Sequence, residues 1–308
     1  MAYRLQSGEE VVHGLRRIVD EELAAAAGVL TSSTSRTRDE AIHEARKSIK
    51  KTRAIVRLVS VDLEGVYQVE NRRLRDLGRT LSEYRDTAAM IEIFDQFQEK
   101  FLADLGPRVL GRVRQELVRQ KSAQGRRTGV AAAVRTTAMA LSQARERAAE
   151  WPLAGSGLNA IAQGLEKGYR RGRKALESAR HDDSPECSHE WRKRVKDHWY
   201  HVRLLEDVLR GAMADYERNL KDLETWLGDH HNLEVLYQKV AADPGAYGGE
   251  ADVTRSLERM RAYQRELRRR ALGLGERLYE TRPREFLGRV ARLWRASEAR
   301  VLRPAVSA

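Results

Sequence analysis

Cysteine and proline are scarce in this sequence, with one cysteine, Cys187, and six prolines among 308 residues. A single thiol excludes an intrachain disulfide framework and is typical of reducing compartments. No run of about 18 apolar residues is present, which argues against a membrane-spanning helix. The first ten residues also lack the apolar segment of a signal peptide. We therefore expect a cytoplasmic protein that does not contact the membrane.

Catalytic and metal-binding motifs are missing as well. The sequence contains no phosphate-binding loop of the G-x-x-x-x-G-K-[ST] type, no G-x-S-x-G nucleophile elbow and no H-E-x-x-H zinc motif. His198 and His201 have a spacing that suits a metal, but no further ligands are evident near them. The sequence thus predicts a protein that is not an enzyme and that has no metal and no cofactor.

Acidic residues are in the minority. Lys and Arg number 57 against 45 Asp and Glu, which gives a formal net charge of +12 and a pI near 9.9. Such an excess of positive charge favours an acidic partner. The candidates are nucleic acid, an anionic membrane and a phosphate polymer. Composition does not choose among them. Apolar residues make up 41% of the chain, so a packed core is expected rather than disorder.

Helix-favouring residues dominate what is present. Ala, Leu, Arg, Glu and Gln are abundant, and apolar residues recur every three or four positions instead of alternating. We therefore predict an all-α fold, with helices over 6–29, 38–60, 66–102, 107–121, 128–150, 157–179, 185–210, 212–241, 251–279 and 283–301. Two helix starts have their own signals. Thr37 with Glu40 suggests a capping box, and Ser184 before Pro185 combines an N-cap with a proline at the first helical position.

An internal repeat organises the chain. The segment His43–Lys50 matches His189–Lys196, at an offset of 146 residues. The same offset aligns Val56-Arg57-Leu58 with Val202-Arg203-Leu204, and Leu74, Asp76, Leu77 and Leu81 with Leu220, Asp222, Leu223 and Leu227. A constant register over about fifty residues indicates a tandem duplication. We predict two similar helical repeats, 1–152 and 153–308, joined by a linker near 151–157.

Each repeat carries a stripe of basic side chains. Spacings of three and four residues place the first stripe on one helix face over about four turns. Its members are His43, Arg46, Lys50, Arg53 and Arg57, widened by Lys47 and Lys51, and the second stripe contains His189, Arg192, Lys196 and Arg203, flanked by Lys193 and Arg194. A single such stripe is usually the solvated edge of an amphipathic helix. Two stripes in register can instead face one channel, where a polyanion between them would relieve their repulsion.

Other basic and aromatic residues have secondary roles in this interpretation. A further wall of the channel is predicted from Arg72, Arg75, Arg79, Arg218 and Lys221, whereas the patch of Lys167, Arg170, Arg171 and Lys174 is expected to be ordinary surface. The first stripe is expected to bind more strongly, because its Lys51 and Arg53 correspond to Asp197 and Trp199. The five tryptophans are expected in the core.

The paired motif resembles the CHAD family, the conserved histidine α-helical domain proteins. The resemblance rests on H-E-x-R-K-x-x-K at His43–Lys50 and His189–Lys196, and extends to L-G-x-x-x-x-x-Y-R-D at Leu77–Asp86 and W-L-G-D-H-H-N at Trp226–Asn232. It implies two four-helix bundles related by a pseudo-two-fold axis, with a basic central groove or pore lined by both stripes. It also implies binding of inorganic polyphosphate and association with polyphosphate granules.

Two alternatives stay open at this point. A nucleic-acid-binding protein is compatible with the net charge, and weak nucleic-acid binding is expected from charge alone, although no helix-turn-helix, zinc-finger or RNA-recognition signature is present. A polyphosphate-processing enzyme would need acidic residues that hold Mg²⁺. Asp86 and Asn232, and likewise Glu83 and Asp229, occupy matching positions in the two repeats. We expect these four residues to have packing or ion-pairing roles instead.

Overall fold

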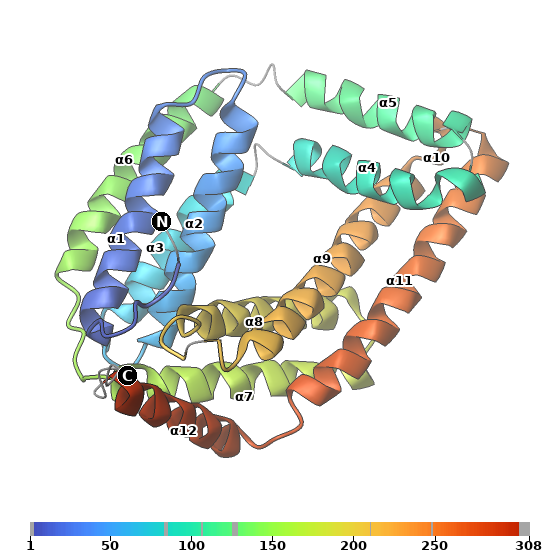
Figure 1. Ribbon diagram of the computed structural model, residues 1–308. Coiled ribbons are helices and arrows are strands. Elements are labelled where there is room, and N and C mark those ends of the chain that lie inside the picture. The colour runs from blue at the N-terminus through green and yellow to red at the C-terminus, as the bar shows by residue number, and fades with distance from the viewer. Residues whose placement is uncertain are drawn as a thin grey trace, which may run out of the picture.

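The computed structural model describes residues 3–82, 86–105, 107–124, 129–209, 211–247 and 249–301. Within these ranges it contains twelve helices and no strand (Figure 1). The predicted all-α class is therefore confirmed. Among the described helices, none is long and apolar enough to cross a membrane.

Four helices of the N-terminal half pack together. α1 (Val11–Thr31) lies between α2 (Arg38–Leu58) and α6 (Val130–Ala149), and α3 (Tyr67–Ser82) contacts both α2 and α6. Each helix is amphipathic, so that its apolar face is buried against its neighbours and its polar face is left for solvent. This group holds α2, and with it the first basic stripe, in a fixed orientation.

The C-terminal half forms a second group. α7 (Asn159–His181) lies against α8 (Pro185–Leu204) and α12 (Pro283–Val301), while α9 (Ala214–Ala242) lies between α8 and α11 (Glu250–Leu278). α2 contacts both α7 and α8, and this contact joins the two groups. One continuous apolar core consequently contains residues from both halves of the chain. The division into two repeats at residue 152 remains a prediction.

α4 (Asp86–Leu105) and α5 (Pro107–Gln124) pair with each other away from the first group (Figure 1). α4 contacts α9 and α11, and α5 contacts the short helix α10 (Pro244–Tyr247). A second apolar core forms at this place, with Phe94 and Leu236 fully buried in it. In the ribbon drawing the helices outline an open frame, with α2 and α8 on adjoining sides (Figure 1).

The helix boundaries correct two predictions. The single helix expected over 66–102 consists of two helices, α3 and α4, which run in different directions (Figure 1), with residues 83–85 between them outside the described part. The capping box at Thr37 is also wrong, because its hydroxyl accepts from the amide of Thr34 at 3.0 Å and caps no amide of α2. The N-cap at Ser184 is confirmed, since its hydroxyl accepts from the amide of Cys187 at 3.3 Å.

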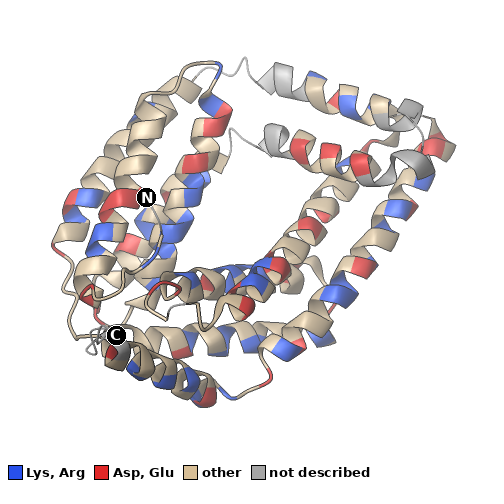
Figure 2. Ribbon diagram, in the orientation of Figure 1, with Lys and Arg blue, Asp and Glu red and all other residues tan. Residues whose placement is uncertain are grey.

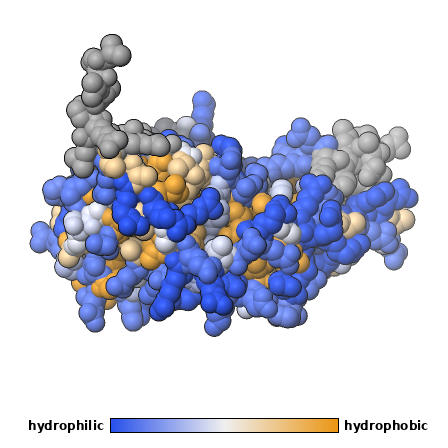
Figure 3. Space-filling model, turned by 60° about the horizontal axis from the view of Figure 1, so that its bottom comes forward, coloured by the Kyte–Doolittle hydropathy of each residue, from blue (hydrophilic) through white to orange (hydrophobic). Residues whose placement is uncertain are grey.

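Charged and apolar residues are distributed unevenly over the fold. Lys and Arg gather along α2 and α8, where the two helices border the middle of the frame (Figure 2). A tilted view shows a mainly hydrophilic surface with apolar patches between the polar side chains (Figure 3). Four of the five tryptophans are buried, namely Trp151, Trp191, Trp199 and Trp294, and Trp226 packs partly buried against the core.

Candidate functional site

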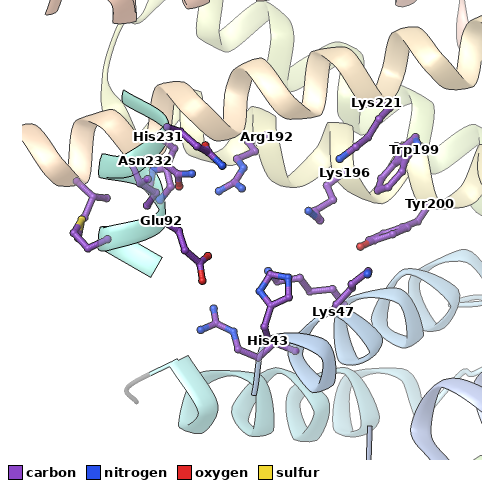
Figure 4. A pocket seen from close by; sticks show the side chains of 16 residues that line it. His43, Lys47, Glu92, Arg192, Lys196, Trp199, Tyr200, Lys221, His231 and Asn232 are labelled. Carbon is purple, nitrogen blue, oxygen red and sulfur yellow. The ribbon is translucent and has the colours of Figure 1, made fainter. Parts of the chain in front are cut away.

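A cleft of about 670 Å³ lies between α2, α4, α8 and α9. Six of its lining residues are cationic, namely Arg46, Lys47 and Lys50 of α2, Arg192 and Lys196 of α8, and Lys221 of α9. Figure 4 shows that side chains from α2 face side chains from α8 and α9 across this space. The structure therefore brings the central parts of both predicted stripes together in one cleft.

Helix periodicity explains the α2 side of the cleft. Ala45 and Ile49 are buried in the core, and the next residue in each case, Arg46 or Lys50, emerges beside it into the cleft. Lys47 is half exposed and donates to Glu44 at 3.2 Å on the same helix. The ammonium and guanidinium groups therefore stand at the edge of the core, where they remain accessible to a ligand.

The opposite side of the cleft is organised by a buried carboxylate. Glu224 of α9 is only 4% exposed. It accepts from Lys196 Nζ at 2.7 Å and from Lys221 Nζ at 2.9 Å, and Arg192 Nη2 lies 3.8 Å away. Gly228, one turn further along α9, leaves room for the Arg192 side chain, because a Cβ there would lie 3.2 Å from its Nη2. Three cations of this wall are thus positioned by α9.

The charge state of this wall follows from that geometry. Burial opposes ionisation of Glu224, but Lys196 and Lys221 outweigh it and lower the pKa of Glu224 to about 2. The carboxylate is therefore ionised at every physiological pH. Burial lowers the pKa of Lys196, and Glu224 counteracts that shift. Glu224 consequently helps to keep Lys196 protonated.

Lys50 has a different environment. Desolvation within the cleft, followed by the cations of Lys196, Arg46 and Arg192, lowers the pKa of Lys50 to about 7. The side chain still reaches solvent through the cleft, and among the described residues it makes no ion pair. The repeat offset places Gly78 where the second half has Glu224, so the first half lacks the corresponding carboxylate. An anion in the cleft would favour the protonated form of Lys50.

Two aromatic residues of α8 line the floor of the cleft. Lys221 Nζ lies 4.7 Å from the ring centroid of Trp199, and the Arg203 guanidinium lies 5.4 Å from it. Lys196 Nζ lies 5.9 Å from the ring of Tyr200. Trp199 and Tyr200 are both buried, and the Tyr200 hydroxyl points toward the cleft (Figure 4). The ring faces near the cleft are therefore already occupied by cations.

Histidines stand at one end of the cleft. His43 lines it from α2 and His231 from α9, and the His231 ring lies tilted against that of His189, with 4.5 Å between centroids. Burial, followed by the neighbouring His189 and Arg192, lowers the pKa of His231 to about 4, so this ring is neutral at physiological pH. Within the described ranges, no group of three His, Cys, Asp or Glu side chains could hold a metal ion.

Two members of the first stripe lie outside the cleft lining. Arg53 donates to Asn71 Oδ1 at 3.2 Å and thereby points toward α3. Arg57 pairs with Asp197 of α8 at 2.8 Å, at the place where α2 crosses α7 and α8. The stripe therefore follows one helix face, as predicted, but different parts of it meet different neighbours.

The remaining predicted residues have mixed positions. Arg203 lies over Trp199 beneath the cleft, Lys193 pairs with Glu190 at 2.6 Å, and His189 stands behind His231. Of the predicted second wall, only Lys221 lines the cleft, and the residues Arg72, Arg75, Arg79 and Arg218 are exposed elsewhere. Asn232 lines the cleft and Asp229 is half-buried on α9. Glu83 and the side chain of Asp86 lie outside the described residues.

Sequence reasoning missed several residues that shape the cleft. These are Glu224, the aromatic pair Trp199 and Tyr200, His231, and Glu92 of α4. Glu224 had one usable signal, because it interrupts the repeat register by matching Gly78. No sequence signal indicated that α4 lines the cleft, because the packing of α4 against α9 is a long-range contact.

The comparison with known families gives one match that covers most of the chain. The family model described as the CHAD domain matches residues 14–241. The chain belongs to the CHAD domain family. The CHAD match includes α2, α8 and α9, and hence the cationic wall on each side of the cleft, and it ends before α11 and α12. No curated protein matches the sequence.

Proposed function

We propose that this CHAD protein binds inorganic polyphosphate in the cleft between α2, α4, α8 and α9, without catalysing a reaction on it. The observation that carries the proposal is the convergence of six Lys and Arg side chains on one cleft, against the lining carboxylate Glu92 and the buried Glu224. Like charges held this close repel each other, and a flexible polyanion between the walls would remove that repulsion. Arg and Lys also form charge-assisted hydrogen bonds with phosphoryl oxygens.

The floor of the cleft favours an inorganic polymer over nucleic acid. Proteins that bind single-stranded nucleic acids commonly stack bases on exposed aromatic rings. Trp199 is 7% exposed and Tyr200 is 3% exposed, and cations lie over both rings. A base would have to displace Lys221 or Lys196 from these rings. Nucleic-acid binding through net charge alone is still expected to be weak and independent of sequence.

The cellular part of the proposal rests on the family. CHAD proteins are associated with polyphosphate binding in general, and we extend this to a cytoplasmic protein that associates with polyphosphate granules. A processing enzyme is the less favoured function, because Glu92 is the one carboxylate among the described lining residues of the cleft, and the buried Glu224 already has two ammonium partners. Incubation with polyphosphate and Mg²⁺ tests this part, since chain shortening would contradict a binding-only role.

Polyphosphate binding is expected to weaken steeply with salt. Polyphosphate carries closely spaced charges, so neutralising them releases condensed counterions, as it does for nucleic acids. With up to six cationic contacts, the affinity is expected to fall by roughly 100-fold or more between 50 and 200 mM salt. Titrations at several salt concentrations measure this slope, and competition with DNA at equal phosphate concentration measures the preference. A flat salt dependence, or equal competition by DNA, would contradict the proposal.

The charge of Glu224 is expected to help or hinder binding depending on pH. At pH 6 protons are abundant enough that Glu224→Gln mainly removes a repulsive charge, and the substitution is expected to strengthen binding by roughly tenfold. At pH 9 the variant loses the carboxylate that keeps Lys196 protonated, so its affinity should fall below that of the wild type. The ratio of the variant's affinity to the wild-type affinity should therefore fall from above one to below one as pH rises.

The comparison at each pH separates this role from a purely structural one. Lys50 also faces the cleft, and Glu224 raises its pKa. Loss of the Glu224 charge therefore lowers the protonation of Lys50 together with that of Lys196, and both changes lower the affinity ratio as pH rises. Weaker binding by Glu224→Gln at every pH would assign Glu224 only to the fold. Tighter binding at every pH would show that the lysines need no counter-charge.

A further inference from the structure

A second group of cations lies where α2 crosses α7 and α8, outside the cleft. A small pocket there is lined by Arg57 of α2, Lys167 and Arg171 of α7, and Arg194 of α8, together with Gly164, Gly168, Asp197 and His201. We call these four Lys and Arg residues the α7 cation cluster. Arg194 lies nearly opposite Arg192 and Lys196 on α8, about 160° around the helix axis, and Asp197 lies roughly 100–140° from them. The cluster is therefore distinct from the cleft.

The first half of the chain offers an internal comparison for this crossing. The repeat offset aligns buried positions of α1 and α7, for example Leu15 with Ile161 and Val19 with Leu165. In the same register Lys167 and Gly168 correspond to Glu21 and Glu22, Arg171 to Ala25, Arg194 to Ser48, and Asp197 to Lys51. The two crossings thus differ in charge at all five places, with opposite signs at two of them and a charged residue against a neutral one at the other three.

At the first crossing the charges are satisfied within the protein. Glu22 accepts from Lys51 Nζ at 2.5 Å, and both side chains are largely buried. Glu21 pairs with Arg17 at 3.2 Å on the same helix. This crossing is held by internal ion pairs and has no unpaired excess of one sign around Lys51.

At the second crossing the charges are not balanced. Asp197 is the single carboxylate of the described pocket lining, and it is shared by Arg57 at 2.8 Å and Arg194 at 4.0 Å. Arg194 also pairs with Glu190 on its own helix, so the imbalance lies at Lys167 and Arg171. Lys167 and Arg171 are half-buried and form no ion pair with any described residue. Lys167 has only the Ser60 hydroxyl at 3.4 Å, and burial followed by Arg171 lowers the pKa of Lys167. Half-buried cations without counter-charges are costly unless an anion accompanies them.

The shape of the pocket suits one oxygen atom of such an anion. Gly168 and Gly164 have no side chains where the first half has Glu22 and Ile18. The enclosed space is about 10 Å³, which is close to the room needed by one water-sized group. Its wall includes His201, whose Nε2 donates to the carbonyl of Ala54 at 2.9 Å, so the donors to an oxygen in the pocket come from the cations and not from this ring. One phosphoryl oxygen can enter while the rest of the anion stays at the mouth.

We propose that the α7 cation cluster is a second anion site, specific for a phosphate group and independent of the cleft. Arg57, Arg171 and Arg194 supply planar guanidinium donors, Lys167 supplies an ammonium group, and the pocket takes one oxygen. In the first half the equivalent place is occupied by carboxylates of the protein itself. The phosphate comes either from free orthophosphate or from a polyphosphate chain that extends beyond the cleft, and both present the same oxygens.

The test converts the second crossing to the residues of the first. Lys167→Glu with Arg171→Ala installs the side chains found at Glu21 and Ala25. The matched control is Lys174→Glu with Arg170→Ala, which changes the charge of the same helix by the same amount at two exposed positions. Arg46→Ala with Lys50→Ala disables the cleft only. Each full-length variant is first checked by circular dichroism and melting, then titrated calorimetrically with orthophosphate and separately with long-chain polyphosphate.

The expected result is a loss of orthophosphate affinity by roughly tenfold or more in the converted variant, with near wild-type affinity in the matched control and in the cleft variant. If polyphosphate affinity also falls in the converted variant, the ligand of the α7 cation cluster is a polyphosphate chain that crosses both sites. If polyphosphate affinity is unchanged, the ligand is free phosphate. Equal losses in the converted variant and the matched control would overturn the proposal, because diffuse charge would then suffice. It would also be overturned if the wild type bound no orthophosphate, or if the cleft variant alone abolished that binding. The orthophosphate outcomes that would overturn the proposal do not depend on polyphosphate binding in the cleft.

Discussion

Replacing Arg46 and Lys50 together by alanine is expected to weaken polyphosphate binding by two orders of magnitude without destabilising the protein. Each lost charge-assisted contact contributes roughly 1.5–3 kcal/mol in a desolvated site and less in a wet one, so the pair should cost about 2–4 kcal/mol, or roughly 30- to 1000-fold in affinity. Both residues line the cleft from α2. Neither makes up part of the apolar core, which the neighbouring Ala45 and Ile49 provide.

The stability of this variant should be equal to or above that of the wild type. The pKa of Lys50 in the folded protein is about 7, against an ordinary value of 10.5. The unfolded chain therefore binds more protons between these values, so this group destabilises the fold fully below pH 7, and the penalty disappears as pH rises toward 10.5. Removing Lys50 abolishes that penalty. The melting temperature without ligand should rise slightly, most clearly at pH values below about 7, and the gain should shrink as pH rises.

The corresponding change on α8 should behave differently. Arg192→Ala with Lys196→Ala also removes two cations from the cleft, but it leaves the buried Glu224 with Lys221 as its remaining hydrogen-bonded ammonium partner. Breaking a buried ion pair typically destabilises by about 3–5 kcal/mol, and the retained partner should reduce this to about 2 kcal/mol. We therefore expect lower affinity together with a lower melting temperature. The double variants on α2 and α8 should therefore differ more in melting temperature than in polyphosphate affinity.

Titration and thermal melting of both double variants measure these differences. Arg72→Ala with Arg79→Ala is the charge-matched control, because these arginines are exposed on α3 and do not line the cleft. A loss of affinity in this control equal to that of Arg46→Ala with Lys50→Ala would locate binding in diffuse surface charge. Wild-type affinity in both cleft variants would place the polyphosphate site elsewhere.

From the sequence we expected the first stripe to bind more strongly than the second, because it carries Lys51 and Arg53. The contacts of these two residues remove that reason. Lys51 is held by the buried Glu22 at 2.5 Å, and Arg53 donates to Asn71, so neither lines the cleft. The position matching Arg53, Trp199, does line it. The asymmetry between the walls lies instead in Glu224, which has no counterpart in the first half because Gly78 stands there.

These cases show what helix periodicity predicts and where it stops. Spacing alone places Arg46 and Lys50 on one face, next to the apolar residues that bury α2. Periodicity does not say which helix that face meets at each turn. Arg57 continues the stripe in sequence, yet two turns beyond Lys50 the neighbours are α7 and α8, and its partner is Asp197. Long-range contacts of this kind depend on tertiary packing rather than on local sequence pattern.

Gly164→Ala is expected to destabilise the protein strongly, because α7 crosses α2 at this glycine. A Cβ there would lie 1.7 Å from the carbonyl oxygen of Leu58 and 2.6 Å from its carbonyl carbon. These are backbone atoms of α2, so no side-chain rotation can relieve the clash, and the two helices must separate. Overpacking of this kind costs about 3 kcal/mol or more when the backbone must shift. The repeat offset aligns Gly164 with Ile18, so sequence symmetry gives no warning of this contact.

Gly273→Ala is the matched control, since Gly273 lies inside α11 and a Cβ there would meet no atom within 4 Å. Alanine at an unhindered helical position should stabilise by roughly 0.5–1 kcal/mol, because glycine loses more conformational freedom on folding. The two glycine-to-alanine changes should therefore shift the melting temperature in opposite directions, by several degrees downward for Gly164. Because α2 carries Arg46 and Lys50 into the cleft, separation of α2 from α7 should also weaken polyphosphate binding by the Gly164 variant at temperatures below its melting point. A Gly164→Ala protein that melted like the wild type would show that α2 and α7 do not cross at this distance, and the placement of the α7 cation cluster against Arg57 would fail with it.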